Sequence, residues 1–451
     1  MVQSTQDKRE TKASAETSGS ASVLDRTFGL TAAGSSVPTE LRAGLATFLT
    51  MAYIMFVNPA ILEKAGMDHG AVFVATCLAA ALSTAIMGLY ANYPIALAPG
   101  MGLNAYFAFT MVPELGGNWQ LALGVVFLSG LLFLIISLTP LREWLINAIP
   151  LTLKFGIAAG IGLFLALIGL QNAGLVAADA TTLVKLGDLS ETKALLAIAG
   201  FLAIAGLAAR KVPGAIIFGV IAVTLAAVWL GLEPWHGLAA MPPSLAPTFL
   251  KMDLSGALQL GLLTMVLTLL LVMLLDTAGT LIGVARQAGL LDKEGRLPRL
   301  RQALLADSSG AMLGAALGTS TTTAYIESAA GVEEGGRTGL TALVVATLFL
   351  ASLFLAPLAQ TVPPYATAPA LLFVACLMAT SLGAIPWDEP TEYIPALTIA
   401  LMIPLSYSIA TGIGLGFIAY VALKLLSGRV REINAASAVI AGAFLLKLIF
   451  A

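Results

Sequence analysis

Two carboxylates stand inside long apolar stretches of this sequence, and they are the residues most in need of a chemical explanation. Asp276 interrupts the apolar run 258–284, and Glu327 follows the hydroxyl-rich run TSTTTAYI at residues 319–326. A charge at the centre of a lipid bilayer costs roughly 2.5–3.5 kcal/mol even on a lenient insertion scale. The two carboxylates indicate either satisfied hydrogen bonds between helices or a site for a ligand or an ion, and we favour the site.

Further polar groups would lie near the carboxylates if the membrane helices are interrupted at the polar and proline-containing stretches of the sequence. A half-helix that begins near Thr323 would place Glu327 at the end of its first turn, with Ala324 and Tyr325 beside the break. Its free N–H groups and the positive end of its dipole would point into the gap. Asn104 follows a second, proline-flanked break and offers both a donor and an acceptor. Such a set suits a flat, neutral ligand with many donors and acceptors better than a bare ion.

The threonines at 319–323 have a second interpretation. Threonine is favoured in extended structure, so their hydroxyls would equally serve to satisfy a short strand. Neither His69 nor His236 has the spacing of a metal ligand, and Cys77 and Cys376 lie in apolar runs. We therefore expect no metal and no cofactor, and we interpret the acidic residues at 388–392 as a solvated turn.

The composition defines the class of protein that carries these residues. The chain has 451 residues, of which 58% are hydrophobic and only 11% are charged. Soluble globular proteins carry roughly 25% charged residues, so we predict an all-α polytopic membrane protein. The net charge of −2 gives no reason to expect a nucleic-acid partner. Without a histidine in any predicted span, an intramembrane enzyme is disfavoured.

Two broken segments divide the apolar spans into matching halves. The first contains Pro94 and Pro99, which favour an extended stretch between two helical pieces. The second is the run at 319–331, and the residues NAYF at 104–107 align with TAYI at 323–326. We also expect the span 258–284 to be interrupted at 276–280. About fourteen segments in two repeats of seven follow, and an odd number inverts the second copy in the membrane, as in secondary transporters.

The placement of positive charge agrees with this topology. With the N-terminus in the cytosol, every arginine falls on the cytosolic side, and only Lys64, Lys185, Lys193 and Lys251 fall outside, with Lys447 unassigned. Such a bias follows the positive-inside rule. The last apolar stretch, 433–450, is either one more span or a helix that lies at the membrane surface.

Three motifs resemble those of the AzgA-like purine permeases, within the nucleobase–ascorbate transporter (nucleobase:cation symporter-2) superfamily. They are ALAPGMGLNAYF at 96–107, LLDTAGTLIG at 274–283 and GTSTTTAYIESAAGVEEGGRTGLTA at 318–342. The resemblance extends from about residue 28 to about residue 426. It implies a uracil-permease-like fold of fourteen segments, with a short strand in each of segments 3 and 10.

The resemblance also implies a division into a core domain and a gate domain. The expected parts are a disordered cytosolic tail at 1–27, core halves at 28–140 and 257–360, gate halves at 141–232 and 361–428, a linker at 233–256, and an unplaced segment at 429–451.

The implied activity is proton-coupled uptake of hypoxanthine, adenine or guanine across the cell membrane by an elevator-like movement. Asn104, Asp276 and Glu327 match substrate-site positions, and Thr323, Ala324 and Tyr325 would lie beside them. Either Asp276 or Glu327 would carry the coupling proton, and we favour Asp276 for the proton and Glu327 as the anchor of the purine. A homodimer is implied only by the wider superfamily. The alternatives are an anion or other small-solute carrier on the same fold, and a transporter that prefers pyrimidines or xanthine.

Overall fold

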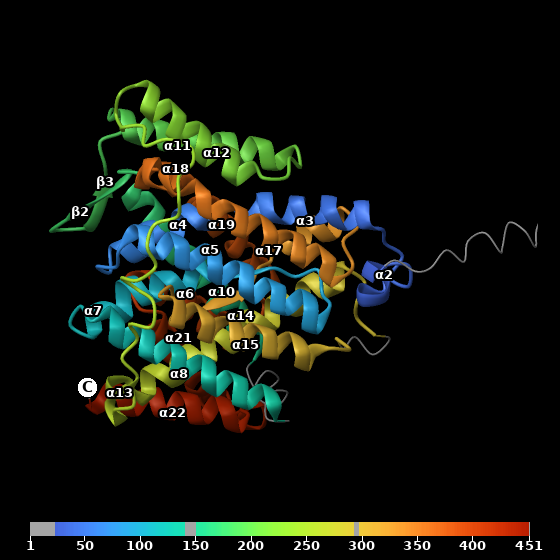
Figure 1. Cartoon of the computed structure of the whole chain (residues 1–451). Coiled ribbons are helices and arrows are strands. Elements are labelled where there is room, and N and C mark those ends of the chain that lie inside the picture. Colours follow the sequence, from blue (N-terminus) through green and yellow to red (C-terminus); the bar gives the residue numbers. More distant parts are fainter. Residues whose placement is uncertain (1–22, 140–149, 293–296, 451) are drawn as a thin grey trace, which may run out of the picture.

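The computed structural model describes residues 23–139, 150–292 and 297–450. Figure 1 shows most helices running side by side in one direction, with the short helix α2 at one end of the molecule and the hairpin β2–β3 at the other. The N-terminal half contains α2 (Val23–Phe28), α3 (Val37–Met51), α4 (Ile54–Glu63), α5 (His69–Ile86), η1 (Met87–Ala91), β1 (Leu97–Pro99), α6 (Met101–Tyr106), η2 (Phe107–Met111), α7 (Val112–Glu114), α8 (Trp119–Leu138), α10 (Leu151–Asn172), β2 (Val176–Asp179), β3 (Leu183–Leu186), α11 (Thr192–Ala209) and α12 (Ala215–Trp229).

The C-terminal half follows the linker. It contains α13 (Leu254–Ala257), η3 (Leu260–Leu262), α14 (Leu263–Gln287), α15 (Leu300–Leu317), β4 (Thr322–Ala324), α16 (Ser328–Glu333), α17 (Gly339–Ser352), η4 (Leu353–Leu355), α18 (Ala356–Thr361), α19 (Pro364–Ala379), η5 (Thr380–Ala384), α20 (Pro390–Ser406), α21 (Ile409–Leu426), η6 (Val430–Glu432) and α22 (Ala435–Phe450).

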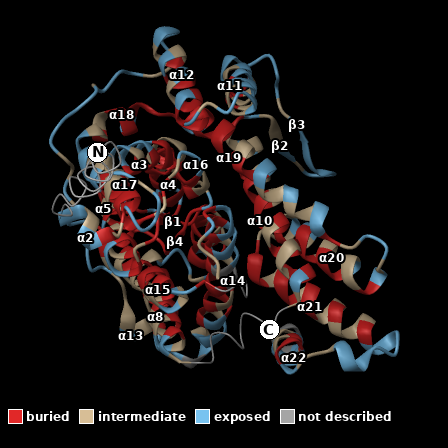
Figure 2. Cartoon of the chain, turned by 90° about the vertical axis from the view of Figure 1, so that its right-hand side faces the viewer, coloured by how far each residue is buried: buried red, intermediate tan, exposed pale blue. Residues whose placement is uncertain are grey.

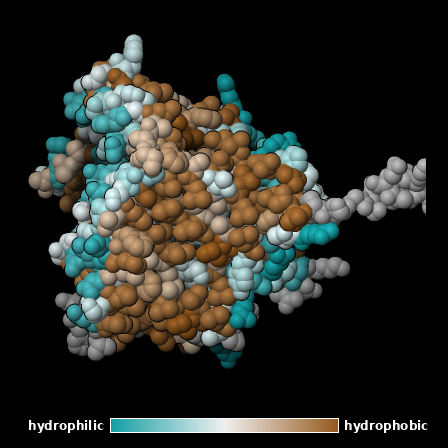
Figure 3. All heavy atoms as spheres, viewed as in Figure 1, coloured by the Kyte–Doolittle hydropathy of each residue, from teal (hydrophilic) through white to brown (hydrophobic). Residues whose placement is uncertain are grey.

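A broad apolar band crosses the middle of the molecule on the face that Figure 3 shows. Within the described ranges, nine helical segments are long and apolar enough to cross a bilayer. Figure 3 shows a wide hydrophobic band on this face, with hydrophilic residues gathered at both ends of the helices. A multi-pass membrane protein is therefore confirmed. The remaining expected spans are shorter, broken or more polar, and α15 and the two strand-bearing segments are examples.

The helices form two bundles, which Figure 2 shows in a view along their axes. The strand-bearing bundle contains α3–α8 and α13–α18, and it surrounds β1 and β4. The outer bundle contains α10–α12 and α19–α22, with α10 packed on both α19 and α20. At their contact, a Cβ on Gly102 of α6 would lie 2.2 Å from Cγ2 of Ile161 on α10, so only glycine fits there.

The two broken segments meet at the centre of the strand-bearing bundle. Strands β1 and β4 are antiparallel, with Leu97 opposite Ala324 and Pro99 opposite Thr322. All six strand residues are buried. Pro99 favours extended structure in the residue before it and ends the ladder, while the threonines supply β-favouring side chains. The interpretation of these threonines as strand residues is thus the one that the backbone supports.

Three local expectations are wrong. The span that contains Asp276 is not interrupted, because α14 is a continuous helix of 25 residues. Part of the expected disordered tail, from residue 23, belongs to α2, whereas residues 1–22 lie outside the described ranges. The alignment of 104–107 with 323–326 is also out of register, since the first run lies in α6 and η2 and the second begins in β4. Strand β1 is the structural counterpart of β4.

The last apolar stretch forms α22, which packs against α21. Figure 1 shows α22 running in the same direction as the other long helices rather than across their ends. A Cβ on Gly414 of α21 would lie 2.3 Å from the ring of Phe444, so the two helices are in close contact. The helix α22 thus lies along the bundle, although its apolar part, Ala435–Leu446, is shorter than the nine candidate spans.

Candidate functional site

The outer edges of the two central strands are covered by side chains from neighbouring helices. On β1, the Thr84 hydroxyl accepts a hydrogen bond from the Leu97 N–H at 2.8 Å and donates to the Leu97 carbonyl at 2.9 Å. On β4, the Asp307 carboxylate accepts the Ala324 N–H at 2.8 Å. A two-stranded sheet inside a membrane protein leaves backbone groups that must be paired with protein. Thr84 of α5 and Asp307 of α15 provide that pairing.

Glu327 occupies the N-cap position of α16, immediately after β4. It is not at the end of a first helical turn, because the half-helix begins at Ser328 and not near Thr323. Its carboxylate accepts a hydrogen bond from the Tyr53 hydroxyl at 2.8 Å. Thr50 donates to the Glu327 carbonyl at 3.3 Å. The side chain is partly exposed, so Tyr53 leaves room for a second donor.

A second cluster of oxygen atoms lies beside β4. The Thr277 hydroxyl donates to Oδ2 of Asp307 at 2.6 Å and lies 3.3 Å from the Thr323 hydroxyl. The Asp276 carboxylate lies close to the Thr323 hydroxyl. Asp307 is fully buried, whereas Asp276 is partly exposed. Because α14 is continuous through 276–280, Asp276 and Thr277 are successive helical residues, and both lie near Thr323.

The three carboxyl groups form one electrostatic unit. Asp276 lies close enough to influence the charge of both Asp307 and Glu327. In the described part of the chain, none of the three forms an ion pair with a lysine or arginine. Full ionisation of neighbouring carboxylates without a cation is unfavourable at membrane depth. A proton or a ligand N–H group would relieve this repulsion.

Asn104 lies in a fully buried network of amides and hydroxyls. Its Nδ2 donates to Oδ1 of Asn58 at 2.6 Å, and its Oδ1 accepts from the Ser320 hydroxyl. Asn58 in turn donates to Thr76 at 2.7 Å and to Thr319 at 2.8 Å. This network ties α4, α5 and α6 to the chain just before β4. Asn104 therefore meets the site through its neighbours, and its direct contact with a substrate stays a prediction.

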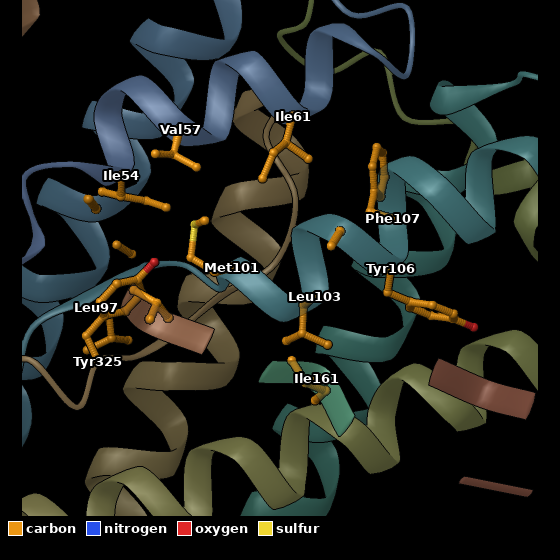
Figure 4. Packing of buried hydrophobic residues seen from close by; sticks show 14 of the residues in the cluster. Ile54, Val57, Ile61, Leu97, Met101, Leu103, Tyr106, Phe107, Ile161 and Tyr325 are labelled. Carbon is orange, nitrogen blue, oxygen red and sulfur yellow. The ribbon is translucent and has the colours of Figure 1, made fainter. Parts of the chain in front are cut away.

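Tyr325 and Ala324 are occupied by contacts within the protein. The Tyr325 hydroxyl donates to the Pro99 carbonyl at 2.5 Å, and its N–H donates to the Ala96 carbonyl at 2.9 Å. Figure 4 shows Tyr325 beside Leu97, while Leu103 faces Ile161. The Ala324 N–H is bonded to Asp307, so in this structure it is not available to a ligand.

The structure thus brings Asp276, Thr323 and Glu327 together around β4, with Ala324 and Tyr325 supporting the strand. Sequence reasoning missed Asp307, Asn58 and Tyr53. Asp307 is flanked by Ser308 and Ser309 in a segment of moderate hydropathy, which hid it among ordinary polar residues. An acidic residue in the middle of an 18-residue helix was the available signal.

The acidic turn before α20 is more than a solvated loop. Arg429 pairs with Glu389 at 2.9 Å, and this bond, with one from Thr391, holds the pKa of Glu389 below its usual value. Lys424, which is 1% exposed, pairs with Glu392 at 2.6 Å and with Glu432 at 2.5 Å. The turn fastens α20 to the end of α21. The described residues contain no group of three or more metal-ligating side chains.

Comparisons with known proteins agree with the resemblance of the motifs. The sequence profile of the permease family matches residues 38–447. The adenine permease AdeP of Escherichia coli K12 is 47% identical over 435 residues, which cover 96% of this chain and 98% of that protein. The guanine/hypoxanthine permease PbuO of Bacillus subtilis 168 is 46% identical over 429 residues, covering 93% and 99%.

Among solved structures, the transmembrane domain of the cyanobacterial bicarbonate transporter BicA has a similar fold. It superposes with a TM-score of 0.63 at 17% identity, covering 84% of this chain and 96% of that one. Identity this low shows the fold alone. The family profile and the two permeases extend over nearly the whole sequence and confirm the AzgA-like resemblance. The chain therefore belongs to the permease family and is a membrane transporter rather than an enzyme.

Proposed function

We propose that this transporter takes up purine nucleobases together with protons. The observation that carries the proposal is the pair of partly exposed carboxylates, Asp276 and Glu327, that flank strand β4. A purine presents ring and exocyclic N–H donors along one edge, and carboxylates accept such donors in strong, charge-assisted hydrogen bonds. The names of AdeP and PbuO, which specify adenine and guanine/hypoxanthine, support the same class of substrate.

Glu327 is the proposed anchor for the purine. Among the described side chains, the Tyr53 hydroxyl donates to its carboxylate, and Glu327 lies at the N-terminal end of α16. An ionised carboxylate accepts several hydrogen bonds at once. Purine N–H groups would donate the remaining hydrogen bonds to the Glu327 carboxylate. Asn104 and Thr323 would orient the purine ring through the surrounding hydrogen-bond network. Tyr325 and Ala324 would hold the strand against which the ring lies.

Asp276 is the proposed site of the coupling proton. Its carboxylate lies close to the Thr323 hydroxyl, which is 3.3 Å from the Thr277 hydroxyl that donates to the buried Asp307. A proton on Asp276 would relieve repulsion within the cluster and would favour the approach of a substrate to the neighbouring Glu327. Release of the substrate would in turn weaken the affinity of Asp276 for the proton. Binding of the proton and the purine would thus be linked, as symport requires.

The proposed movement is that of the strand-bearing bundle, as a core domain, against the outer bundle, as a gate. Support comes from the pairing of β1 with β4 inside one bundle and from polar links between the two bundles that could break. At the end of the molecule opposite α2, Thr110 donates to the Tyr407 carbonyl at 2.5 Å, and Lys64 donates to Asn172. These bonds must break if the site opens toward that end.

We place the N-terminus in the cytosol and the protein in the cell membrane. Basic residues expected on one side do lie together, since Arg26, Arg299 and Arg337 line one pocket. Lys64, expected outside, lies near Asn172 at the opposite end. A homodimer stays a proposal from the wider superfamily.

Binding measurements on purified protein test the anchor. A thermal-shift panel of purines, pyrimidines and small anions should show stabilisation by hypoxanthine, adenine or guanine, and Glu327→Gln should weaken purine binding by roughly 1–2 kcal/mol because it replaces an ionic acceptor by a neutral amide. Glu334→Gln is the matched control, since Glu334 is an exposed carboxylate at the other end of α16. Equal purine affinity in Glu327→Gln and wild type would refute the anchoring role.

Transport measurements test the coupling. Hypoxanthine uptake into proteoliposomes should increase with an imposed inward pH gradient, and Asp276→Asn should abolish that response while purine binding persists. Stabilisation by an anion such as bicarbonate, with none by purines, would favour the alternative of an anion carrier.

A further inference from the structure

A pocket of about 520 Å³ opens at the end of the molecule where α2 lies, away from the carboxylate cluster. The described residues that line it include three arginines, Arg26, Arg299 and Arg337, and no acidic residue. The three come from α2, from the start of α15 and from the turn after α16. Segments far apart in the sequence thus converge to build one positively charged cavity. We propose that this pocket binds a phosphate group carried by a lipid headgroup or by a small soluble phosphate ester.

The donors in the pocket are only partly used by the protein. Nη1 of Arg299 donates to the Ala91 carbonyl at 3.0 Å, and Nη1 of Arg337 donates to the carbonyls of Val332 and Gly336, each at 2.7 Å. These backbone bonds hold the two guanidinium groups in place. A guanidinium has five N–H donors in a fixed fork that matches phosphate oxygens. The other nitrogens of both side chains have no partner among the described residues.

Unlike Arg299 and Arg337, the Arg26 side chain is not held by hydrogen bonds to backbone carbonyls of the described residues. It is exposed on α2 and forms no hydrogen bond or ion pair within the described ranges. The nearby carboxylate of Asp25 is bonded to the Thr31 N–H at 2.8 Å, and that of Glu40 accepts the N–H groups of Arg337 and Thr338. Neither acid lines the pocket, and none of the three arginines forms an ion pair in the part of the chain that the structure describes. A cavity lined by one sign of charge concentrates counter-ions of the other sign.

The walls of the pocket are held firmly enough to form a defined site. Asn92 donates to the Phe28 carbonyl at 2.9 Å and accepts the Gly339 N–H at 2.7 Å, which joins α2 to the start of α17. Phe28 also packs with Leu340. The Tyr93 ring lies under Arg299, with the guanidinium carbon 5.8 Å from the ring centre. Phe28, Ala32, Ala33 and Leu290 also line the pocket, and its volume accommodates the organic part of an ester as well as its phosphate.

The pocket also touches both broken segments at their ends. Tyr93 precedes β1 by a few residues, and Arg337 follows α16. A bound phosphate would therefore bridge the two segments that carry the central strands. The proposal concerns binding at this pocket and does not depend on the identity of the transported substrate.

The test uses the full-length protein purified in a neutral detergent. One arm adds phosphatidylglycerol, with phosphatidylcholine as the neutral comparison, and the other adds guanosine monophosphate or inorganic phosphate. Each arm measures thermal stabilisation and, for the lipid, retention by native mass spectrometry. We expect saturable binding in one arm, and we expect Arg26→Gln to weaken it about tenfold through loss of one charge-assisted contact. Arg337→Gln should weaken it as well.

Arg42→Gln is the matched control, because Arg42 is exposed on α3 and does not line the pocket. Stabilisation by phosphatidylglycerol alone identifies a lipid headgroup, and stabilisation by guanosine monophosphate or phosphate identifies a soluble ester. Binding in neither arm overturns the proposal. The proposal is also overturned if wild type, Arg26→Gln and Arg337→Gln bind equally strongly. Hypoxanthine uptake by Arg26→Gln, measured in parallel, shows that this variant is folded.

Discussion

Replacement of Asp307 tests whether a buried carboxylate is needed to complete the edge of strand β4. Asp307→Leu removes the acceptor of the Ala324 N–H and one partner of the Thr277 hydroxyl. Thr277 can turn toward Thr323, 3.3 Å away, but the Ala324 N–H has no such alternative. A buried polar group without a partner costs about 1–3 kcal/mol. Asp307→Asn keeps a carbonyl oxygen at the same position.

Both substitutions remove the charge, so their difference isolates the cost of the unpaired N–H group. We expect the free energy of unfolding, measured by titration with sodium dodecyl sulfate in mixed micelles, to be about 1–3 kcal/mol lower for Asp307→Leu than for Asp307→Asn. Ser308→Ala is the neighbouring control, because the Ser308 hydroxyl bonds only to carbonyls of its own helix. Equal stability of the Leu and Asn variants would refute the role assigned to Asp307 at the strand edge.

Three further predictions concern packing and charge. Gly339→Ala should lower the free energy of unfolding by at least about 1–3 kcal/mol, because the added Cβ would lie 1.9 Å from the Gly88 carbonyl oxygen. Gly206→Ala is the control. Gly206 has open space around it, so its replacement should be neutral or slightly stabilising in the same unfolding titration. Asn58→Leu should lower both stability and purine affinity, since it disconnects the amide network, and an unchanged dissociation constant would show that this network does not shape the site. Lys424→Met should lower the free energy of unfolding by up to about 3 kcal/mol, because breaking a buried ion pair leaves an uncompensated charge. Adding Glu392→Gln removes that charge and should restore part of the lost stability. No recovery in the double variant would argue against that pairing.

The membrane character and the location of the breaks were predictable from local properties of the chain. Hydropathy identifies an apolar segment without knowledge of its neighbours, because each spanning helix satisfies its own backbone. Proline and threonine patterns indicated breaks at 94–99 and 319–323 by the same local logic, and strands β1 and β4 overlap these stretches. Asp276 and Glu327 stood out because a carboxylate is conspicuous in an apolar run.

Predictions that needed a partner segment were less successful. The interruption expected at 276–280 is absent, since small residues and threonines there remain compatible with a helix packed against protein. The start of the half-helix after β4 was placed several residues too early, because the pairing with β1 keeps Thr322–Ala324 extended. Asp307 was overlooked because its importance comes from the strand edge that it covers and not from its own sequence context.

The sequence by itself determined that this protein is a polytopic membrane protein with two broken segments and two conspicuous carboxylates, because these features depend on the solvent preference of each segment. Only the tertiary structure decided which groups those segments meet. The antiparallel pairing of β1 with β4 joins residues more than 200 positions apart in the chain. It leaves one strand edge to Thr84 and the other to Asp307, and it positions Glu327 beside Tyr53. Hydrogen bonds are short and directional, so the chemistry of each carboxylate follows from the donors that the fold brings to it.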